Sequence, residues 1–266
     1  MFAQMRHMAI VTSNANHEGD FYRDIFGMKR SGLARAGGAV VVGDGYVGLN
    51  LNPRAPGRQA GFDHFGFEVQ DTEVVFRRLK ENFPKIQVLK RPSNRPFAGI
   101  SMHDPAGNVF DLSQLNMDNR RDLYTDKVEE RKRRIGHFGL RCVEPDQCAE
   151  FYRDVFELTE MEKPAGDRNH YLSDGKVTLA VMPWKISDFY GSGIERPALD
   201  HIGFKVESLA AFKADVEKHA HLYVPEENRP EKNPEREIRQ KLLASCCFGQ
   251  YQMSDPDGVL IDVSEN

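Results

Sequence analysis

Repetition at a constant offset constrains the fold of this chain more than any other feature of its sequence. The segment Arg6–Val11 precedes Phe21-Tyr22-Arg23-Asp24, and the similar segment Gly136–Arg141 precedes Phe151-Tyr152-Arg153-Asp154. His7 and His137 lie 130 residues apart, and so do Phe21 and Phe151. A repeat of this length indicates duplicated structural units, so we expect the same local fold in both halves.

A second pair of similar segments divides each half again. Phe62-Asp63-His64-Phe65-Gly66-Phe67 matches Leu199-Asp200-His201-Ile202-Gly203-Phe204. Each leads to an Asp-Pro-x-Gly turn, at 104–107 and 255–258, and then to an apolar closing segment. The chain therefore contains four modules, which start near Met5, Phe62, Ile135 and Leu199.

The pattern within a module predicts its secondary structure. Each opens with alternating, strand-like residues and continues with apolar residues at helical spacing, such as Phe21, Ile25 and Met28. Asp-Gly pairs at 44–45 and 174–175 then indicate short hairpin strands. We expect an α+β fold of four βαβββ modules, arranged as two domains. The predicted divisions are an N-terminal domain over 1–115, a charged linker over 116–134 and a C-terminal domain over 135–266.

Two polar segments interrupt this pattern. The linker includes Glu129-Glu130-Arg131-Lys132-Arg133-Arg134, which is typical of a solvated connection and is compatible with a helix. The fourth module carries a polar insertion at roughly residues 225–248. Insertions of this length are commonly lids, interface arms or disordered loops. We expect a homo-oligomer, for which this insertion could supply a contact arm.

Composition excludes several classes of function. The 266 residues carry 40 acidic and 36 basic side chains, a formal net charge of −4, which does not favour nucleic acid as a partner. No apolar segment is long enough to span a membrane, and the N-terminal residues lack the features of a signal peptide. No P-loop or dinucleotide fingerprint is present. We expect a cytoplasmic protein with reduced thiols at Cys142, Cys148, Cys246 and Cys247.

Histidines and carboxylates recur at equivalent strand positions. Alternation places His64, Gly66 and Glu68 on one face of a strand, opposite the large apolar residues, and the same parity holds for His201 and Gly203. Asp111 and Asp262 lie in otherwise apolar strands, where a carboxylate is costly to bury unless a cation or donor meets it. Two histidines and one carboxylate can form a facial metal triad. The candidate ligand sets are His7, His64 and Asp111, and His137, His201 and Asp262.

The module order, the His-plus-Gly strands and the Asp-Pro-x-Gly turns resemble the vicinal oxygen chelate superfamily of glyoxalases, bleomycin-resistance proteins and extradiol dioxygenases. The resemblance implies half-barrels whose concave faces hold a divalent metal. A chain of four modules is most similar to the type I extradiol dioxygenases. That similarity implies Fe(II), with Mn, Zn or Ni as alternatives, bound in the C-terminal half by His137, His201 and Asp262.

The sequence departs from the dioxygenase pattern at three positions. Both halves end their ligand set with Asp, where the family usually has Glu. The acid–base histidine expected late in the third module is absent from Val177–Met182. Gln252 stands where the family has a Tyr, and Tyr251 lies one position away. The candidate catalytic groups are therefore Gln252, Tyr251 and His103, with Ser101 at the position equivalent to Gln252.

These observations favour a metal-dependent enzyme that acts on a small, oxygen-rich or aromatic substrate. A ring-cleaving dioxygenase is the first choice because the chain has four modules. A glyoxalase-type lyase or isomerase is the enzymatic alternative, and it would need a base such as His103 or Glu68 in the N-terminal half. The alternative from another class is a small-molecule-binding protein of the resistance type, without turnover.

Overall fold

The structure is a computed structural model, and it describes residues 1–33, 36–93, 95–117, 122–125, 131–223 and 234–266. The first half contains β1 (Ala3–Thr12), α1 (Ala15–Phe26), β2 (Lys29–Arg30), the 3-10 helix η1 (Ala36–Gly38), β3 (Val40–Gly43), β4 (Gly48–Pro53), β5 (Gly61–Val69), α2 (Thr72–Asn82), β6 (Val88–Lys90), β7 (Ile100–His103) and β8 (Val109–Gln114). The second contains β9 (Arg134–Cys142), α3 (Pro145–Phe156), β10 (Thr159–Glu160), β11 (His170–Ser173), β12 (Thr178–Pro183), α4 (Ile186–Ser192), β13 (Ala198–Val206), α5 (Leu209–Tyr223), α6 (Pro234–Ala244), β14 (Tyr251–Ser254) and β15 (Leu260–Glu265).

The strands form two sheets with equivalent topology. The first sheet has the order β2-β3-β4-β1-β5-β8-β7-β6, and the second has the order β10-β11-β12-β9-β13-β15-β14. In each, the opening strands of the two modules pair antiparallel at the centre, and each also pairs parallel with the last strand of its own module. The predicted α+β fold of βαβββ modules in two half-barrels is confirmed. Within the described residues, the fourth module has two strands after its helices rather than three.

The module helices begin and end where local signals place them. The side chain of Asn14 accepts a hydrogen bond from the backbone N–H of His17 and so caps the start of α1. Gly27 ends this helix in the left-handed region, with φ at 67°, which glycine adopts without strain. Asp71 caps α2 in the same way as Asn14, through the N–H of Glu73.

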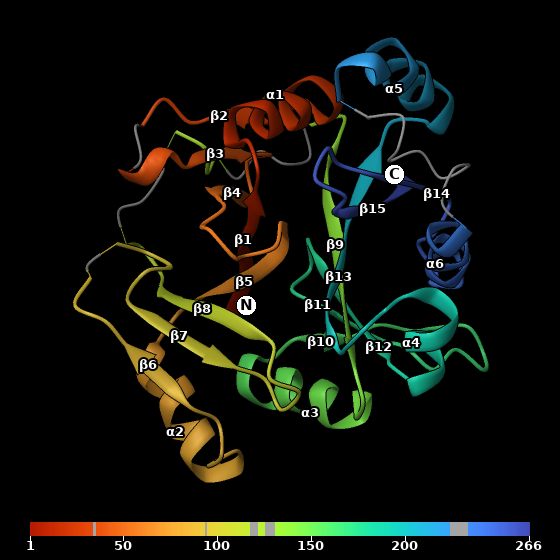
Figure 1. Cartoon of the computed structure of the whole chain (residues 1–266). Helices are drawn as coiled ribbons and strands as arrows, with labels where there is room; N and C mark the ends of the chain where they lie inside the picture. The colour runs from red at the N-terminus through yellow and green to blue at the C-terminus, as the bar shows by residue number, and fades with distance from the viewer. Residues whose placement is uncertain (34–35, 94, 118–121, 126–130, 224–233) are drawn as a thin grey trace.

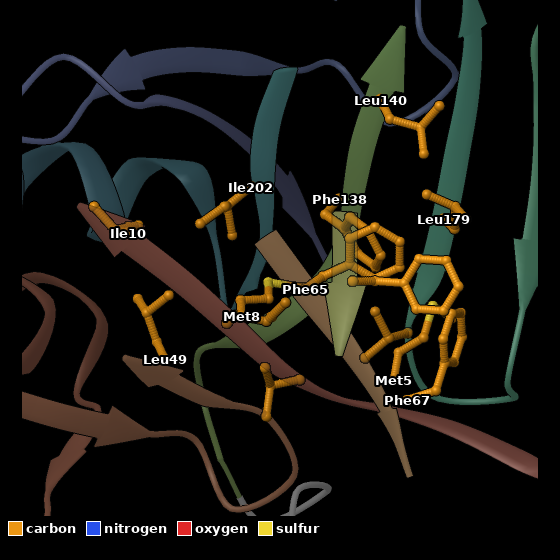
Figure 2. Close-up of a cluster of buried hydrophobic side chains, with 14 of the residues drawn as sticks. Met5, Met8, Ile10, Leu49, Phe65, Phe67, Phe138, Leu140, Leu179 and Ile202 are labelled. Carbon is orange, nitrogen blue, oxygen red and sulfur yellow. The ribbon is translucent and has the colours of Figure 1, made fainter. Parts of the chain in front are cut away.

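Both sheets contribute to one hydrophobic core, in which α1 and α5 lie against each other, as do α2 and α3 (Figure 1). Side chains from the two halves point toward one another in Figure 2, where Phe65 and Phe138 have ring centroids 4.8 Å apart. Phe26 stacks on Phe204 at 3.8 Å, so a helix of the first half packs on a strand of the second. The predicted helix anchors Phe21, Tyr22, Phe151 and Tyr152 are all fully buried in this core, as expected.

Reciprocal polar contacts also join the halves. The hydroxyl of Tyr22 donates to Asp255 Oδ2 at 3.0 Å, and the hydroxyl of Tyr152 donates to Asp104 Oδ2 at 2.9 Å. These tyrosines belong to the repeated Phe-Tyr-Arg-Asp elements, and the aspartates open the repeated Asp-Pro-x-Gly turns. Each repeated Phe-Tyr-Arg-Asp element therefore binds the Asp-Pro-x-Gly turn of the opposite half.

The linker is not a solvated connection where the structure describes it. Leu123 is buried, and the hydroxyl of Tyr124 donates to the backbone oxygen of Arg6. Arg133 donates to the backbone oxygen of Ile25 and forms ion pairs with acidic groups of the second half. Apolar and charged partners on both sides hold this segment against the protein. The acidic pair 129–130 lies outside the described residues.

The remaining structural expectations concern the cysteines, the membrane and the insertion. All four cysteines are free, and only Cys247 is exposed. Among the described residues, no helix is long and apolar enough to cross a membrane. Residues 225–233 of the predicted insertion lie outside the described part, whereas the rest contains α6, which contacts α4 and β14.

Candidate metal centres

Three neighbouring strands assemble the candidate site of the second half. Gly203 in β13 pairs with His137 in β9 on one side and with Asp262 in β15 on the other. His201 lies two residues before Gly203, on the same face of β13. The three predicted side chains come together as a result. Each offers one ligand atom, all these atoms lie within 4.8 Å of one another, and all three residues are fully buried.

The first half builds the same arrangement with a more open cluster. Gly66 in β5 pairs with His7 and with Asp111, so the register is that of the second half. His7 Nε2 lies 3.2 Å from His64 Nε2, and His64 Nε2 lies 3.3 Å from Asp111 Oδ2. The side chain of His64 retains 20% exposure, against 0% for His201.

Glycines make room for the histidine rings. A Cβ added at Gly203 would lie 1.9 Å from His137 Cε1, and one added at Gly139 would lie 2.2 Å from His201 Cε1. Ala9 occupies the position equivalent to Gly139 in the first half. Because Ala9 carries a Cβ beside its paired residue His64, the same close approach is not available there, which fits the greater exposure of His64.

An aspartate orients the second histidine of each cluster. Asp200 Oδ2 lies 3.0 Å from His201 Nδ1, and Asp63 Oδ2 lies 2.7 Å from His64 Nδ1. With the proton on Nδ1, His201 turns an Nε2 lone pair toward its cluster. Burial raises the pKa of Asp200, but the charge of Arg141 and the contact with His201 outweigh it and hold that pKa far below its usual range.

Strand parity alone does not predict these aspartates, because each sits at a β-bulge. In β5 the pairing steps from His64 to Phe62 and leaves Asp63 without a partner in the register. In β13 the pairing steps from His201 to Leu199 and leaves Asp200 without a partner in the register. A bulge re-aims the side chain of the extra residue. Both aspartates can therefore reach the adjacent histidine.

The carboxylates of the two clusters are held by Gln252 and Ser101, two of the sequence candidates, which pair with them in the register. Gln252 Nε2 donates to Asp262 Oδ1 at 3.0 Å, and the hydroxyl of Ser101 donates to Asp111 Oδ1. Arg91 donates to Ser101 Oγ at 2.6 Å and lies 3.6 Å from Asp111 Oδ1. Asp111 of the first half thus has the cation of Arg91 beside it, whereas Asp262 of the second half has the neutral amide of Gln252.

Polar atoms inside the second cluster remain unsatisfied. His137 Nε2, His201 Nε2 and Asp262 Oδ2 are buried and have no hydrogen-bond partner among the described residues. His137 Nε2 and Asp262 Oδ2 are 3.1 Å apart but lack hydrogen-bond geometry. Buried groups of this kind are costly unless something binds them. Two imidazole nitrogens and one carboxylate oxygen are a donor set that suits a divalent transition metal, and the shorter Asp reaches the cluster.

One group in each cluster has a shifted pKa. Burial lowers the pKa of His64, but its contacts with Asp111 and Asp63 outweigh this effect and raise the pKa to about 9. Burial raises the pKa of Asp262, but the interactions with His137 and His201 outweigh it and lower the pKa. Asp262 therefore stays ionised, as a charged ligand must.

An aromatic ring covers the first histidine of each cluster, a feature that the sequence analysis missed. Phe97 stacks on His7 and Phe248 stacks on His137, both with centroids 4.7 Å apart. Each phenylalanine lies 14 residues before the carboxylate of its cluster, so the repeat spacing itself was a usable signal. Phe248 is the last residue of the predicted insertion, so the end of the insertion covers His137 of the second cluster.

The remaining candidates lie away from the ligand atoms. Both ring nitrogens of His103 contact backbone groups, the N–H of Gln87 and the oxygen of Asp104. Tyr251 packs against Phe212, on the face of β14 opposite Gln252. The structure therefore gives His103 and Tyr251 no place among the groups around either cluster.

The fold and the candidate sites define a class of protein built from paired βαβββ modules that carry two histidines and one carboxylate on neighbouring strands. Residues 4–112 match the family model described as the Glyoxalase/Bleomycin resistance protein/Dioxygenase superfamily, so this part of the chain is a domain of that superfamily. The second half repeats its element order. The predicted resemblance is thereby confirmed. No curated protein matches the chain.

Solved structures with the same fold include three dioxygenases. Homoprotocatechuate 2,3-dioxygenase from Arthrobacter globiformis is 14% identical with a TM-score of 0.67, over 100% of this chain and 80% of that one. An extradiol ring-cleaving dioxygenase from B. fuscum is 13% identical with a TM-score of 0.65, over 98% and 71%. A halotolerant catechol dioxygenase is 15% identical with a TM-score of 0.59, over 100% and 87%. At these identities the likeness concerns the fold.

Proposed function

We propose that the chain is a metal-dependent enzyme whose principal centre consists of His137, His201 and Asp262. The observation that carries the proposal is the convergence of three buried ligand atoms without hydrogen-bond partners among the described residues. Fe(II) is the first choice because two histidines and one carboxylate leave positions open for substrate and dioxygen. Mn, Zn and Ni can use the same donors.

The residues around the centre would each have a defined part. His137 and His201 would bind the ion through Nε2 and Asp262 through Oδ2, while Gln252 holds the other carboxylate oxygen. Asp200 keeps the proton of His201 on Nδ1. When bound, the ion would polarise substrate oxygens and, if it is iron, allow dioxygen to be activated. Phe248 and the surrounding core would keep bulk water away from His137.

We further propose ring cleavage of a small aromatic substrate with adjacent oxygens as the reaction. The support is the fold shared with the extradiol dioxygenases over nearly all of this chain. The family's acid–base histidine has no counterpart in Val177–Met182, and Gln252 replaces its tyrosine. Proton transfer would therefore have to use other groups.

A second centre at His7, His64 and Asp111 forms part of the proposal. Arg91 partly compensates the charge of Asp111, so we expect weaker metal binding there than in the second half. A glyoxalase-type reaction is the second candidate for this half. Glu68, a potential base, lines a cavity of about 430 Å³ together with Phe97, which stacks on His7.

The test begins with metal analysis of protein purified without chelator and then reconstituted with Fe(II) under anaerobic conditions. We expect Asp262→Ala to remove the more tightly bound equivalent, and Asp111→Ala, the matched change in the other half, to remove only the weaker one. Oxygen consumption with catechols then tests the reaction. Absence of any bound transition metal would overturn the proposal. Metal binding without oxygen uptake would retain the centre and exclude the dioxygenase.

A further inference from the structure

A second cavity adjoins the cluster of the C-terminal half. It has a volume of about 380 Å³ and lies between β9, β12, α6 and the 164–169 loop. That volume suits a small organic ligand. Its walls include the apolar residues Met182, Pro183 and Leu242 and the cationic residues Arg141, Arg168 and Lys185.

Arg141 is the buried charged residue in the lining of this cavity. Its side chain is only 5% exposed, and Nε donates to Asp200 Oδ1 at 3.1 Å. Nη2 is buried and has no hydrogen-bond partner among the described residues. A buried guanidinium donor without an acceptor is costly, and carboxylates fit its geometry well. Val11 occupies the equivalent position of the first half, so only the second half has this group.

The cavity lining holds three cations against two carboxylates, Asp167 and Asp188. Asp167 accepts from the hydroxyl of Tyr171 and from the N–H of Asn169. Asp188 accepts from the backbone N–H of Lys185 at the start of α4. Arg168 and Lys185 are exposed at the cavity and add positive charge around Arg141. An entering anion would therefore meet net positive charge.

Two contacts connect the cavity to the cluster. Arg141 and His201 bind different oxygens of the same carboxylate, Asp200. Met182 lines the cavity, and its Cε would lie 2.9 Å from a Cβ added at Gly139, the residue packed against His201. A ligand in the cavity thus lies one side chain away from a proposed metal ligand.

We propose that this cavity binds the carboxylate of a small aromatic acid, with Arg141 as its principal anchor. The apolar walls would hold the ring, and Arg168 and Lys185 would attract the charge. The inference rests on the proposed function only where it takes this acid to be the substrate or product of the centre formed by His137, His201 and Asp262. Binding of the carboxylate itself does not require the metal.

The experiment measures benzoate binding to metal-free protein by calorimetry, with benzamide as the neutral control of the same shape. We expect benzoate to bind and benzamide to bind at least about tenfold more weakly, the effect of losing a charge-assisted hydrogen bond. Arg141→Met should weaken benzoate binding by about tenfold or more. Arg239→Met is the matched control, because Arg239 also contacts Asp200 but does not line the cavity, and it should retain benzoate binding.

Substitutions at the exposed residues Lys185 and Arg168 test the inference without disturbing the buried core. Lys185→Ala and Arg168→Ala should each weaken benzoate binding about two- to fivefold, an effect of rim charges that increases at low salt. Equal affinity for benzoate and benzamide, or unchanged binding in both Arg141→Met and the rim variants, would overturn the inference. Metal content is measured on the same samples. If the wild-type protein binds benzoate but no metal, the proposed function alone is contradicted. If it binds metal but not benzoate, the inference alone is contradicted.

Discussion

Gly203 lies directly against the ring of His137, so close that a Cβ at this position would be 1.9 Å from the ring carbon Cε1. The same residue pairs in register with His137 and with Asp262. The backbone of β13 therefore occupies the space between two members of the cluster, and glycine is the residue that leaves the imidazole in place.

Gly203→Ala should displace His137 and abolish metal binding in the C-terminal half. Inserting a methyl group into this packed region should also lower the free energy of unfolding by about 1–3 kcal/mol. Metal analysis and urea denaturation measure the two effects. Gly191→Ala is the control, since a Cβ there meets nothing within 4 Å. Wild-type metal content in the Gly203 variant would show that His137 is not a ligand.

Asp200→Asn should weaken metal binding at the second centre roughly 10–100-fold, because the amide no longer fixes the Nδ1 proton of His201. Competition with a chelator measures the affinity of each centre. Asp63→Asn should affect only the first centre, since Asp63 contacts His64. If both variants weakened both centres equally, the effect would be general destabilisation rather than orientation of one histidine.

Phe248→Ala should expose the ring of His137 and speed metal loss to a chelator at the second centre by roughly tenfold or more, since water gains access to a dry site. Phe97→Ala should act in the same way on the first centre only. Stopped-flow mixing with a coloured chelator follows both rates. An unchanged rate in Phe248→Ala would mean that the ring packs on His137 without protecting the centre.

Glu18 should make the folded protein less stable as the pH rises. This carboxyl is buried in α1, and burial together with the charge of Asp255 raises its pKa well above the ordinary value of 4.5. The folded state thus holds a proton that the unfolded state releases above pH 4.5. Stability from this group is complete below that pH and declines above it, by at most about 1.4 kcal/mol for each pH unit.

Glu18→Gln should therefore be more stable than the wild type at pH 8, and the advantage should shrink toward pH 4.5. Urea denaturation at several pH values measures the difference between the two proteins, which removes the contribution of other titrating groups. Cys148 occupies the equivalent position in the second half and carries no such charge at neutral pH. Parallel pH profiles for variant and wild type would contradict the prediction.

The repeats made the fold and the two clusters of candidate ligands predictable, because a period of two along β5 and β13 places the histidines on the same face as the glycines. The orienting aspartates were not predictable in this way, since the bulges at Asp63 and Asp200 break that period. The shared core was also missed. Apolar spacing in α1 shows that Phe26 is buried, but not that it packs on Phe204, 178 residues later in the chain.

The reciprocal contacts Tyr22–Asp255 and Tyr152–Asp104 have the form of an isologous dimer interface, in which each partner offers the same patch to the other. Here a single polypeptide supplies both partners. In a true homodimer every substitution would appear in both sites at once. Covalent fusion removes that restriction, so the halves have been able to diverge where it matters chemically. Val11 against Arg141, Ala9 against Gly139 and Ser101 against Gln252 are such divergences, and each lies beside a candidate centre.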